Sequence, residues 1–351
     1  MGYARHGPPR FALALCLTLC TVVVVLALGE ERVQPADEPG MALLPMYEVN
    51  DEMRKANDVL WKHLSAALRQ QAQEQHRQDL LPQIPERLFR LAEEDSRTLL
   101  DLWQSPDLLM GQTCGYPFVR QLKPSANVQL VLTPSYGHFE SHNNDSDSSS
   151  VEEGYYRSLI VVRKGGDIRE ERDLLGKQDT LRAVINDHFS NSGMNLFRDY
   201  MLNLMMTMGE GEETNPQQPR CFAEVKVSGG HRRSIEMVAR GEADVASVDC
   251  FTFAFLKEQM PEVVADVMVV GRTRHSPGLP IIAAEGVSKD LIEMLRSSWT
   301  EVLKEKEVKE ELRWAFDMLH ITGFRQFKEE DYAVILEMEK RAIAAGYPIL
   351  A

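Results

Sequence analysis

The chain has 351 residues, of which 44% are apolar and 26% charged, as in a soluble globular protein that buries one large core or two lobes. Its formal net charge of −14 argues against the broad positive field with which proteins bind nucleic acid, so no nucleic-acid partner is expected. An anion can still bind such a protein, but only through local hydrogen-bond donors.

The N-terminus predicts a location outside the cytoplasm. Arg5 and Arg10 precede an uninterrupted apolar run over residues 11–28, and the small residue Gly29 follows it. Residues 1–29 are therefore expected to be either a cleaved secretory signal peptide or an uncleaved anchor that crosses the membrane through residues 11–28. In both cases the body of the protein is expected to be periplasmic or secreted.

The first part of the chain predicts a linker followed by alternating strands and helices. Residues 30–40 are polar and contain two prolines, which is typical of a linker. A strand is expected at 41–49, and Asn50 then begins an amphipathic helix as its cap. Further on, the pattern indicates a second helix and a short apolar strand before 111–117, and another strand ending at Tyr136.

Residues 137–154 differ in composition from the rest of the chain. They are rich in serine, asparagine and acidic residues and have little apolar content, so a polar exposed loop is expected. The acidic residues lack the glycine and glutamate spacing of a calcium-binding loop, and no metal site is expected. We expect the chain to cross from one lobe to another at this loop.

Strands and helices alternate regularly after residue 155, which favours an α/β protein with mostly parallel sheets flanked by helices. Two lobes are expected rather than one large sheet. The first lobe is expected to take residues 41–136 and 251–351, and the second lobe residues 155–250.

Three cysteines would remain after cleavage at Gly29, namely Cys114, Cys221 and Cys250. An odd number with wide spacing predicts neither a disulfide framework nor a zinc site. Two alternatives stay open. Cys221 and Cys250 form one disulfide, or all three are small buried thiols.

Three loops between a strand and a helix share glycine and hydroxyl or amide residues: 111–117, 190–195 and 228–234. In α/β sheets such loops gather at the carboxyl ends of the strands, where ligands bind. The unpaired N–H groups and the positive end of a helix at each loop suit a phosphate-like anion. The alternative is that Ser192 or Asn191 is a simple N-cap and that the glycines serve only tight turns.

Catalytic motifs are absent from the sequence, including the nucleophile elbow, the zinc-protease motif, the P-loop and the dinucleotide-binding motif. An enzyme would have to use Cys114 as nucleophile with His231 as base, or Asp249 as a general base. A buried thiol, a capping histidine and an aspartate that caps the next helix are the alternatives.

The motifs together resemble a known family. The segments YYRSLIVVRKG, SNSGMN, SGGH and GEADVASVD occur in the order found in the phosphate, phosphite and phosphonate-binding proteins of ABC transporters. The resemblance runs from about Leu43 to Gly346. It implies a two-lobed type II periplasmic-binding-protein fold, with the ligand in a cleft between the lobes and no cofactor.

The resemblance also implies roles for individual residues. From the second lobe, Ser190, Ser192 and Gly193 would be oxyanion donors, His231 a charge-assisted donor, and Asp249 would face the other end of the ligand or accept its hydroxyl. The complete expected ligand-binding set is Tyr47, Gln112, Thr113, Tyr116, Ser190, Asn191, Ser192, Gly193, Met194, Asn195, Gly230, His231 and Asp249. Asn191 departs from the family pattern, in which many members carry another hydroxyl residue, and we expect it to decide which oxyanion fits.

These observations lead to one main hypothesis about function. The protein is expected to be a non-enzymatic extracytoplasmic receptor, monomeric, that captures phosphate, phosphite or a phosphonate and delivers it to the permease subunit of an ABC transporter. A sensory receptor of the same fold that acts without transport is the alternative.

Overall fold

The computed structural model describes residues 40–92, 95–137, 152–175, 177, 179–208, 221–347 and 350. The predicted signal peptide or anchor, nearly all of the predicted linker and most of the predicted polar loop therefore lie outside the described residues. Among the residues that are described, no helix has both the length and the apolar character that crossing a membrane requires.

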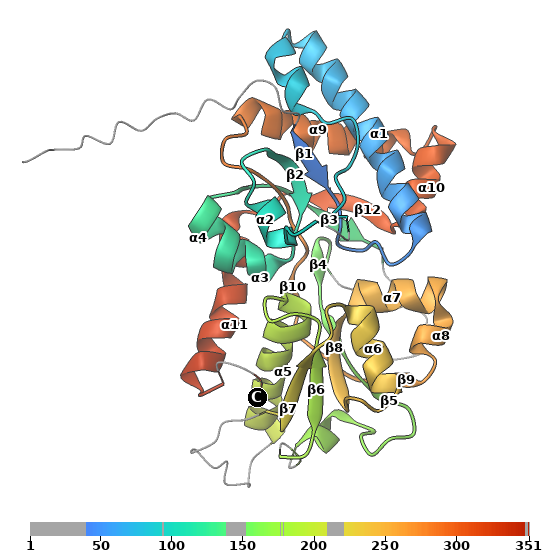
Figure 1. Ribbon diagram of the computed structural model, residues 1–351, viewed down its shortest axis with the longest axis vertical. Helices are drawn as coiled ribbons and strands as arrows, with labels where there is room; N and C mark the ends of the chain where they lie inside the picture. Colours follow the sequence, from blue (N-terminus) through green and yellow to red (C-terminus); the bar gives the residue numbers. More distant parts are fainter. Residues whose placement is uncertain are drawn as a thin grey trace, which may run out of the picture. The chain divides into compact units, whose positions relative to one another are not determined.

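Two five-stranded sheets organise the chain (Figure 1). The first has the strand order β1-β2-β11-β3-β12 and the second the order β7-β6-β8-β5-β9. The strands of the first sheet are β1 (Met41–Leu43), β2 (Leu108–Gln112), β3 (Gln129–Tyr136), β11 (Ile281–Ala283) and β12 (Ile321–Arg325). Those of the second are β5 (Ser158–Arg163), β6 (Arg182–Ile185), β7 (Glu224–Val227), β8 (Val245–Asp249) and β9 (Val267–Arg272).

Both sheets are mixed rather than mostly parallel, which corrects that part of the expectation. In the first sheet β11 runs antiparallel to β2 and β3, and β12 runs antiparallel to β3. In the second sheet β5 runs antiparallel to β8 and β9. The reason is the path of the chain, because β5 and β11 each enter their sheet from the other lobe instead of returning through a crossover helix.

Two short strands, β4 (Tyr155–Tyr156) and β10 (Ser276–Pro277), connect the lobes. They pair with each other in antiparallel fashion, with Tyr156 opposite Ser276, and form a ribbon that belongs to neither large sheet (Figure 1). β4 leads into β5, and β10 leads from β9 back to β11. We call this pair the β4–β10 ribbon.

The division between the lobes differs from the expected one. β9 pairs with β5, so the second sheet continues past residue 250, where the second lobe was expected to end. Helices α7 (Cys250–Gln259) and α8 (Pro261–Val264) pack with α6 (His231–Ala239) of the same lobe. The return to the first lobe therefore takes place at β10.

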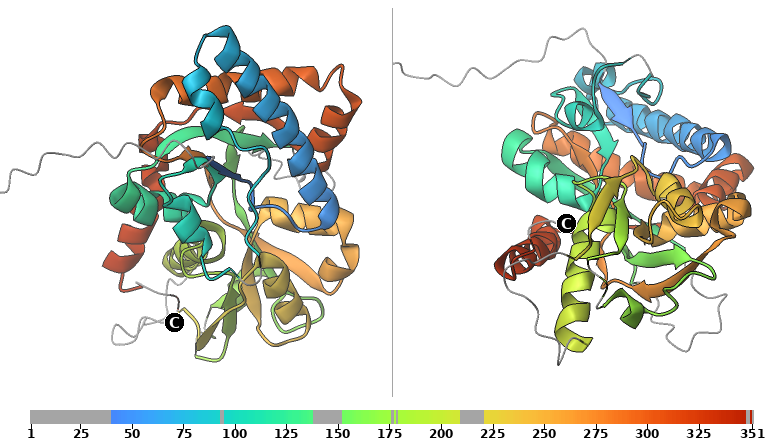
Figure 2. Two further views of the ribbon diagram at one scale, coloured as in Figure 1. Left: turned by 45° about the horizontal axis from the view of Figure 1, so that its top comes forward. Right: turned by 60° about the horizontal axis from the view of Figure 1, so that its bottom comes forward.

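The helices that cover the first sheet are amphipathic. α1 (Asp51–Glu74) begins at Asn50, whose side chain accepts a hydrogen bond from Met53 N at 2.9 Å, as the sequence predicts. Its buried residues follow the three- and four-residue spacing of one helix face. α1 lies beside α9 (Lys289–Glu305) and α10 (Glu310–Met318), and the views in Figure 2 agree.

The remaining helical segments are short, except for α5 (Leu196–Met208) and α11 (Ala333–Ala344), which pack against each other. α5 continues from a π-helical turn η5 (Asn191–Asn195), and α11 packs against both. The others are η1 (Gln78–Gln83), α2 (Leu99–Trp103), α3 (Gly115–Pro117), η2 (Phe118–Leu122), α4 (Lys123–Ala126), η4 (Glu171–Leu174) and η6 (Glu329–Tyr332). α3, η2 and α4 form one continuous helical run.

Cys114, Cys221 and Cys250 are all buried, and none of the three forms a disulfide. The expectation of small buried thiols is confirmed, and the alternative of a Cys221–Cys250 disulfide is wrong.

The cap of α1 gives a test of the fold. Replacing Asn50 with Ala removes the acceptor of the Met53 amide, and we expect the free energy of unfolding to fall by about 1 kcal/mol in urea denaturation. Asn50→Asp keeps an acceptor at the helix start and should lose much less. Equal stability of Asn50→Ala and the unmodified protein would contradict this role of the cap.

Candidate functional site

The helix start at residues 190–195 is buried where the two lobes meet. Ser190 caps it, because its hydroxyl oxygen accepts the Gly193 amide at 2.9 Å. Asn195 N donates to Ser190 O at 3.1 Å, which closes a wide π turn of the kind often found at functional sites. All residues of η5 are buried, so this end of the helix presents its N–H groups to protein atoms rather than to bulk water.

Gly193 lies close to the Asn186 side chain. A Cβ atom at this position would lie 1.8 Å from Asn186 Oδ1, so a larger residue would have to displace the side chain of the asparagine that follows β6. The Asn186 side-chain oxygen is itself buried and has no hydrogen-bond partner in the described part of the chain.

The Ser192 hydroxyl connects this helix start to the next one. His231 Nε2 lies 2.7 Å from Ser192 Oγ, and Ser190 Oγ lies 3.2 Å from the same atom. The carbonyl oxygen of Ser192 accepts hydrogen bonds from Ser158 Oγ at 3.0 Å and Ser247 Oγ at 2.6 Å. Ser192 is thus held by β5, β8 and the start of α6.

His231 is neutral at physiological pH. Burial lowers the pKa of its imidazole to about 4. Its Nδ1 atom is buried and has no partner among the described residues. A hydrogen bond from this ring to an oxyanion would be strengthened only by the negative charge of the ligand, because the imidazole itself is neutral.

Cys114 approaches the same helix start from the first lobe. The Asn191 amide donates to Cys114 Sγ at 3.3 Å. Burial raises the pKa of the thiol, although the amides of Asn191, Tyr116 and Ser192 act in the opposite direction. The sulfur atom therefore lies where N–H groups from two helix starts converge. The neighbouring Thr113 is fully buried, and its hydroxyl has no partner in the described structure.

A second group of polar contacts joins the lobes at Asp249. Its Oδ1 atom accepts the amides of Phe251 and Thr252 at 2.9 and 3.0 Å, and its Oδ2 atom accepts the Tyr47 hydroxyl at 3.1 Å. Asp249 is only 2% exposed, and burial raises the pKa of its carboxyl group to about 6.

Aromatic rings surround this carboxylate. The rings of Tyr47 and Tyr136 meet edge to face at 5.0 Å between centroids, and Phe251 lies 4.8 Å from Tyr136. Gln112 donates through Nε2 to the Tyr136 hydroxyl at 2.9 Å. One end of the contact between the lobes is thus rich in N–H and hydroxyl donors, and the other is aromatic with a single carboxylate.

Other predicted ligand-binding residues have different neighbours. The Tyr116 hydroxyl donates to Glu339 of α11 at 2.6 Å, and the Gly230 amide donates to Ser228 Oγ at 3.3 Å. Met194 belongs to the hydrophobic core. Asn195 donates from Nδ2 to the carbonyl oxygen of Ile335 at 3.1 Å. The side chain of Asn191, expected to select the oxyanion, donates to the β4–β10 ribbon instead.

Several residues of this region were not identified from the sequence, namely Tyr136, Tyr156, Ser158, Ser247 and Ser276. Ser247 could have been found, because side chains two residues apart in a strand share a face and Ser247 precedes Asp249 by two. Tyr156 and Ser276 carried no such signal, since their importance depends on the pairing of two strands that are far apart in the sequence.

The pKa shifts of Cys114 and His231 do not favour an enzyme that uses Cys114 as nucleophile and His231 as base. A nucleophilic cysteine needs a lowered pKa, and burial raises the pKa of Cys114. His231 bonds Ser192 through Nε2, and its pKa of about 4 makes it a weak base at neutral pH.

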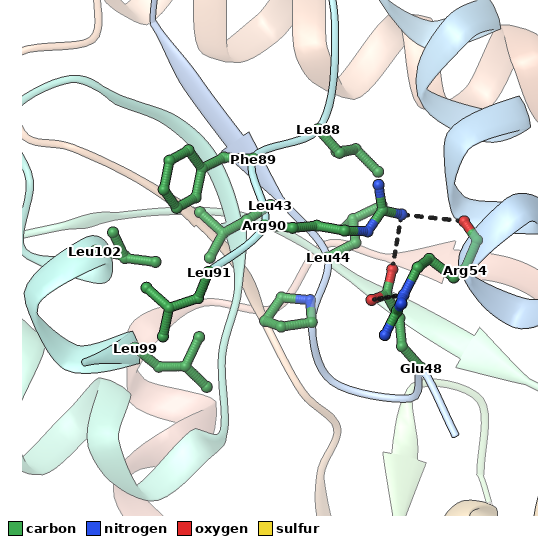
Figure 3. A pocket seen from close by; sticks show the side chains of 11 residues that line it. Leu43, Leu44, Glu48, Arg54, Leu88, Phe89, Arg90, Leu91, Leu99 and Leu102 are labelled. Atoms are coloured by element: carbon green, nitrogen blue, oxygen red, sulfur yellow. Dashed lines mark hydrogen bonds and ion pairs between the residues drawn. The ribbon is translucent and has the colours of Figure 1, made fainter. Parts of the chain in front are cut away.

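A pocket of about 240 Å³ lies elsewhere, in the first lobe (Figure 3). Its lining is mainly leucine, and its polar side chains are occupied by one another, because Arg90 bonds Glu48 at 3.0 Å and also the carbonyl oxygen of Arg54. None of the predicted ligand-binding residues lines it. A much smaller cavity of about 20 Å³ is lined by Tyr47, Gln112 and Tyr136 among others.

Comparison with known proteins places the chain in a family. Residues 107–332 match the family described as ABC transporter, phosphonate, periplasmic substrate-binding protein. A phosphonates-binding periplasmic protein of Escherichia coli (strain K12) is 27% identical over 163 residues, which cover 46% of this chain and 45% of that protein. The match thus spans less than half the length of this curated relative.

Two solved structures are similar over most of the chain. PhnD1 from Prochlorococcus marinus (MIT 9301), in complex with methylphosphonate, has a TM-score of 0.62 at 16% identity and covers 88% of this chain and 98% of its own. A binding-protein component of an ABC phosphonate transporter from Pseudomonas aeruginosa has a TM-score of 0.59 at 14% identity, with 88% of each chain covered. At such identities the likeness shows the fold, and the expected two-lobed α/β fold is confirmed.

None of these relatives is described as a sensor, so they give no support to the sensory alternative. The family match covers more than half of the chain and agrees with the motifs from which the resemblance was inferred. The protein therefore belongs to the family of periplasmic substrate-binding proteins of phosphonate ABC transporters.

Proposed function

We propose that this protein captures a small phosphorus oxyanion, a phosphonate, phosphite or phosphate, outside the cytoplasm and delivers it to the permease of an ABC transporter. The proposal rests mainly on one observation. The buried helix start at Ser190–Asn195 is bonded to the neutral donor His231 and faces a second helix start at Cys114 in the other lobe. Both sides of the site come from one chain, so a monomer suffices.

Helix starts suit an oxyanion for electrostatic reasons. Their N–H groups and the helix dipole favour negative charge, and the hydroxyls of Ser190 and Ser192 can add donors to the same place. Hydrogen bonds to a charged acceptor are roughly twice as strong as neutral ones. A protein with a net charge of −14 can therefore bind an anion through these local donors.

Two buried polar atoms in this region support the same proposal. Thr113 Oγ1 and His231 Nδ1 have no hydrogen-bond partner in the described part of the chain. A buried polar group without a partner costs about 1–3 kcal/mol, so a polar ligand that bonds either atom would regain part of that cost.

Ligand binding can be tested by thermal shift with phosphate, phosphite, methylphosphonate, aminoethylphosphonate and sulfate. A ligand at a hundred times its Kd adds about 2.7 kcal/mol of stability, so at least one phosphorus oxyanion should raise the Tm clearly. A panel in which no phosphorus oxyanion changes the Tm would contradict the proposed function.

The site itself is tested by Ser192→Ala. The substitution removes the hydroxyl that His231 contacts, and a hydrogen bond to a charged group is worth about 1.5–3 kcal/mol, so we expect a roughly ten- to hundredfold higher Kd by calorimetric titration. Ser288→Ala is the matched control, because Ser288 caps α9 far along the chain and its loss should lower stability without changing Kd. Unchanged affinity of Ser192→Ala would place the ligand elsewhere.

The pKa of Asp249 predicts a pH dependence of stability in the ligand-free protein. Because this pKa is raised from 3.8 to about 6, the folded state binds a proton more tightly than the unfolded chain does. The resulting stabilisation is complete below the unfolded pKa and is lost as pH rises through about 6.

Asp249→Asn lacks this titration but keeps an oxygen for the α7 amides. Between about pH 4 and pH 7 the unfolding free energy of the unmodified protein should fall by roughly 2–3 kcal/mol relative to the variant. His231 titrates in both proteins, so its contribution cancels in the comparison. If the unfolding free energies of the two proteins from urea denaturation change equally with pH, the pKa of the Asp249 carboxyl is not raised.

A further inference from the structure

The side chain of Asn191 is fully used by the protein. It is 0% exposed, and its Nδ2 group donates to Tyr156 OH at 2.8 Å and to Ser276 Oγ at 2.9 Å. Its Oδ1 atom accepts Asn195 Nδ2 at 3.1 Å. Both amide hydrogens and the carbonyl oxygen therefore have protein partners, which leaves no side-chain donor for an oxyanion.

The two acceptors lie in the segments that connect the lobes. Tyr156 belongs to β4 and Ser276 to β10, and the two residues are paired opposite each other in the ribbon. A single amide group thus bonds both strands at the same position. A serine or threonine hydroxyl in place of Asn191 has one hydrogen and a shorter reach, so it cannot donate to both strands.

The backbone around Asn191 extends these contacts to the first lobe. The backbone amide of Asn191 donates to Cys114 Sγ. Asn195 donates from its side chain both to the Asn191 side chain and to the carbonyl oxygen of Ile335 in α11. The start of the α5 helix, the ribbon, α11 and the loop at Cys114 are thereby joined through one buried residue.

The geometry points to Asn191 as a positioning residue that couples the oxyanion-binding helix start to the β4–β10 ribbon. This inference rests on the proposed function, because it takes the helix start as the ligand site. Any bending of the ribbon moves Tyr156 and Ser276 relative to η5, so the two bonds favour one ribbon conformation and link it to the position of the donors. The effect on the ligand is indirect and does not depend on which oxyanion is bound.

Binding measurements distinguish coupling from direct contact. The variants are Asn191→Ala, Tyr156→Phe and the double variant, with calorimetric Kd values for methylphosphonate and inorganic phosphate. Each single variant should raise both Kd values by about tenfold, within the usual range of coupling between sites, and leave their ratio unchanged. The Kd of the double variant should lie within about twofold of the Kd of the weaker-binding single variant, because both substitutions remove the same link.

Asn127→Ala is the control. Asn127 ends α4 in the first lobe and donates to Glu285, away from the ribbon, so its loss should affect stability and not Kd. A change in the ratio of the two Kd values in Asn191→Ala, with none in Tyr156→Phe, would make Asn191 a ligand contact and overturn the inference. Additive losses in the double variant would overturn it as well.

Hydrogen exchange provides a readout that needs no ligand. In the ligand-free protein, Asn191→Ala should speed amide exchange in segments 155–158 and 274–278, and Asn127→Ala should not. Unchanged exchange in both segments would overturn the inference even if the unmodified protein binds oxyanions. An unmodified protein that binds neither probe, with faster ribbon exchange in Asn191→Ala, would remove the proposed function and leave the link between helix start and ribbon established.

Discussion

The burial of a helix start between two lobes is the constraint on which the rest of the site depends. The first turns of a helix leave amide groups without partners inside the helix, and such groups cannot be buried unless other atoms accept their hydrogen bonds. Here the residues of η5 are all buried, and the acceptors come from Ser190 within the turn and from Cys114 of the other lobe. Partners in both lobes are needed to satisfy this one segment.

The side chains that contact the helix start at Asn191 and Ser192, Cys114 and His231, are neutral, whereas the buried Arg198 donates to Asn195 Oδ1 at 2.8 Å at the other end of the same turn. Burial lowers the pKa of His231 and raises that of Cys114, so both remain uncharged at neutral pH. A buried cation would bind an oxyanion more strongly but would also have to be desolvated and would hinder release. Asp249 is the charged group at the other end of the contact, and its raised pKa reflects the cost of keeping a carboxylate there.

Local features of this architecture could be predicted from the sequence, because they depend on residues close together in the chain. The Asn50 cap, the helix start within 190–195 and the strand that ends at Asp249 are of this kind, although the residue that caps this helix start is Ser190 and not Ser192 or Asn191. The antiparallel course of β5, the return at β10 and the pairing of β12 with β3 depend on long-range contacts and were missed or misplaced. Asn191 shows the limit best. Its position in the motif indicated a ligand contact, and its partners at Tyr156 and Ser276 give it another role.

The C-terminal helix α11 adds a constraint on movement of the lobes. Glu339 accepts the Tyr116 hydroxyl from the first lobe, and Arg341 lies 2.8 Å from the buried carboxylate of Asp199 in the second. Earlier in the same helix, the carbonyl oxygen of Ile335 accepts a hydrogen bond from the Asn195 side chain. Glu339 also pairs with Arg120 of the first lobe at 3.4 Å, but the Arg120 side chain is 56% exposed, so losing that pair costs little. Asp199 is only 1% exposed, so separating it from Arg341 would leave a buried charge less well compensated. If the lobes move apart, α11 should therefore stay with α5 and part from the first lobe, so that the helix moves with the oxyanion-binding helix start.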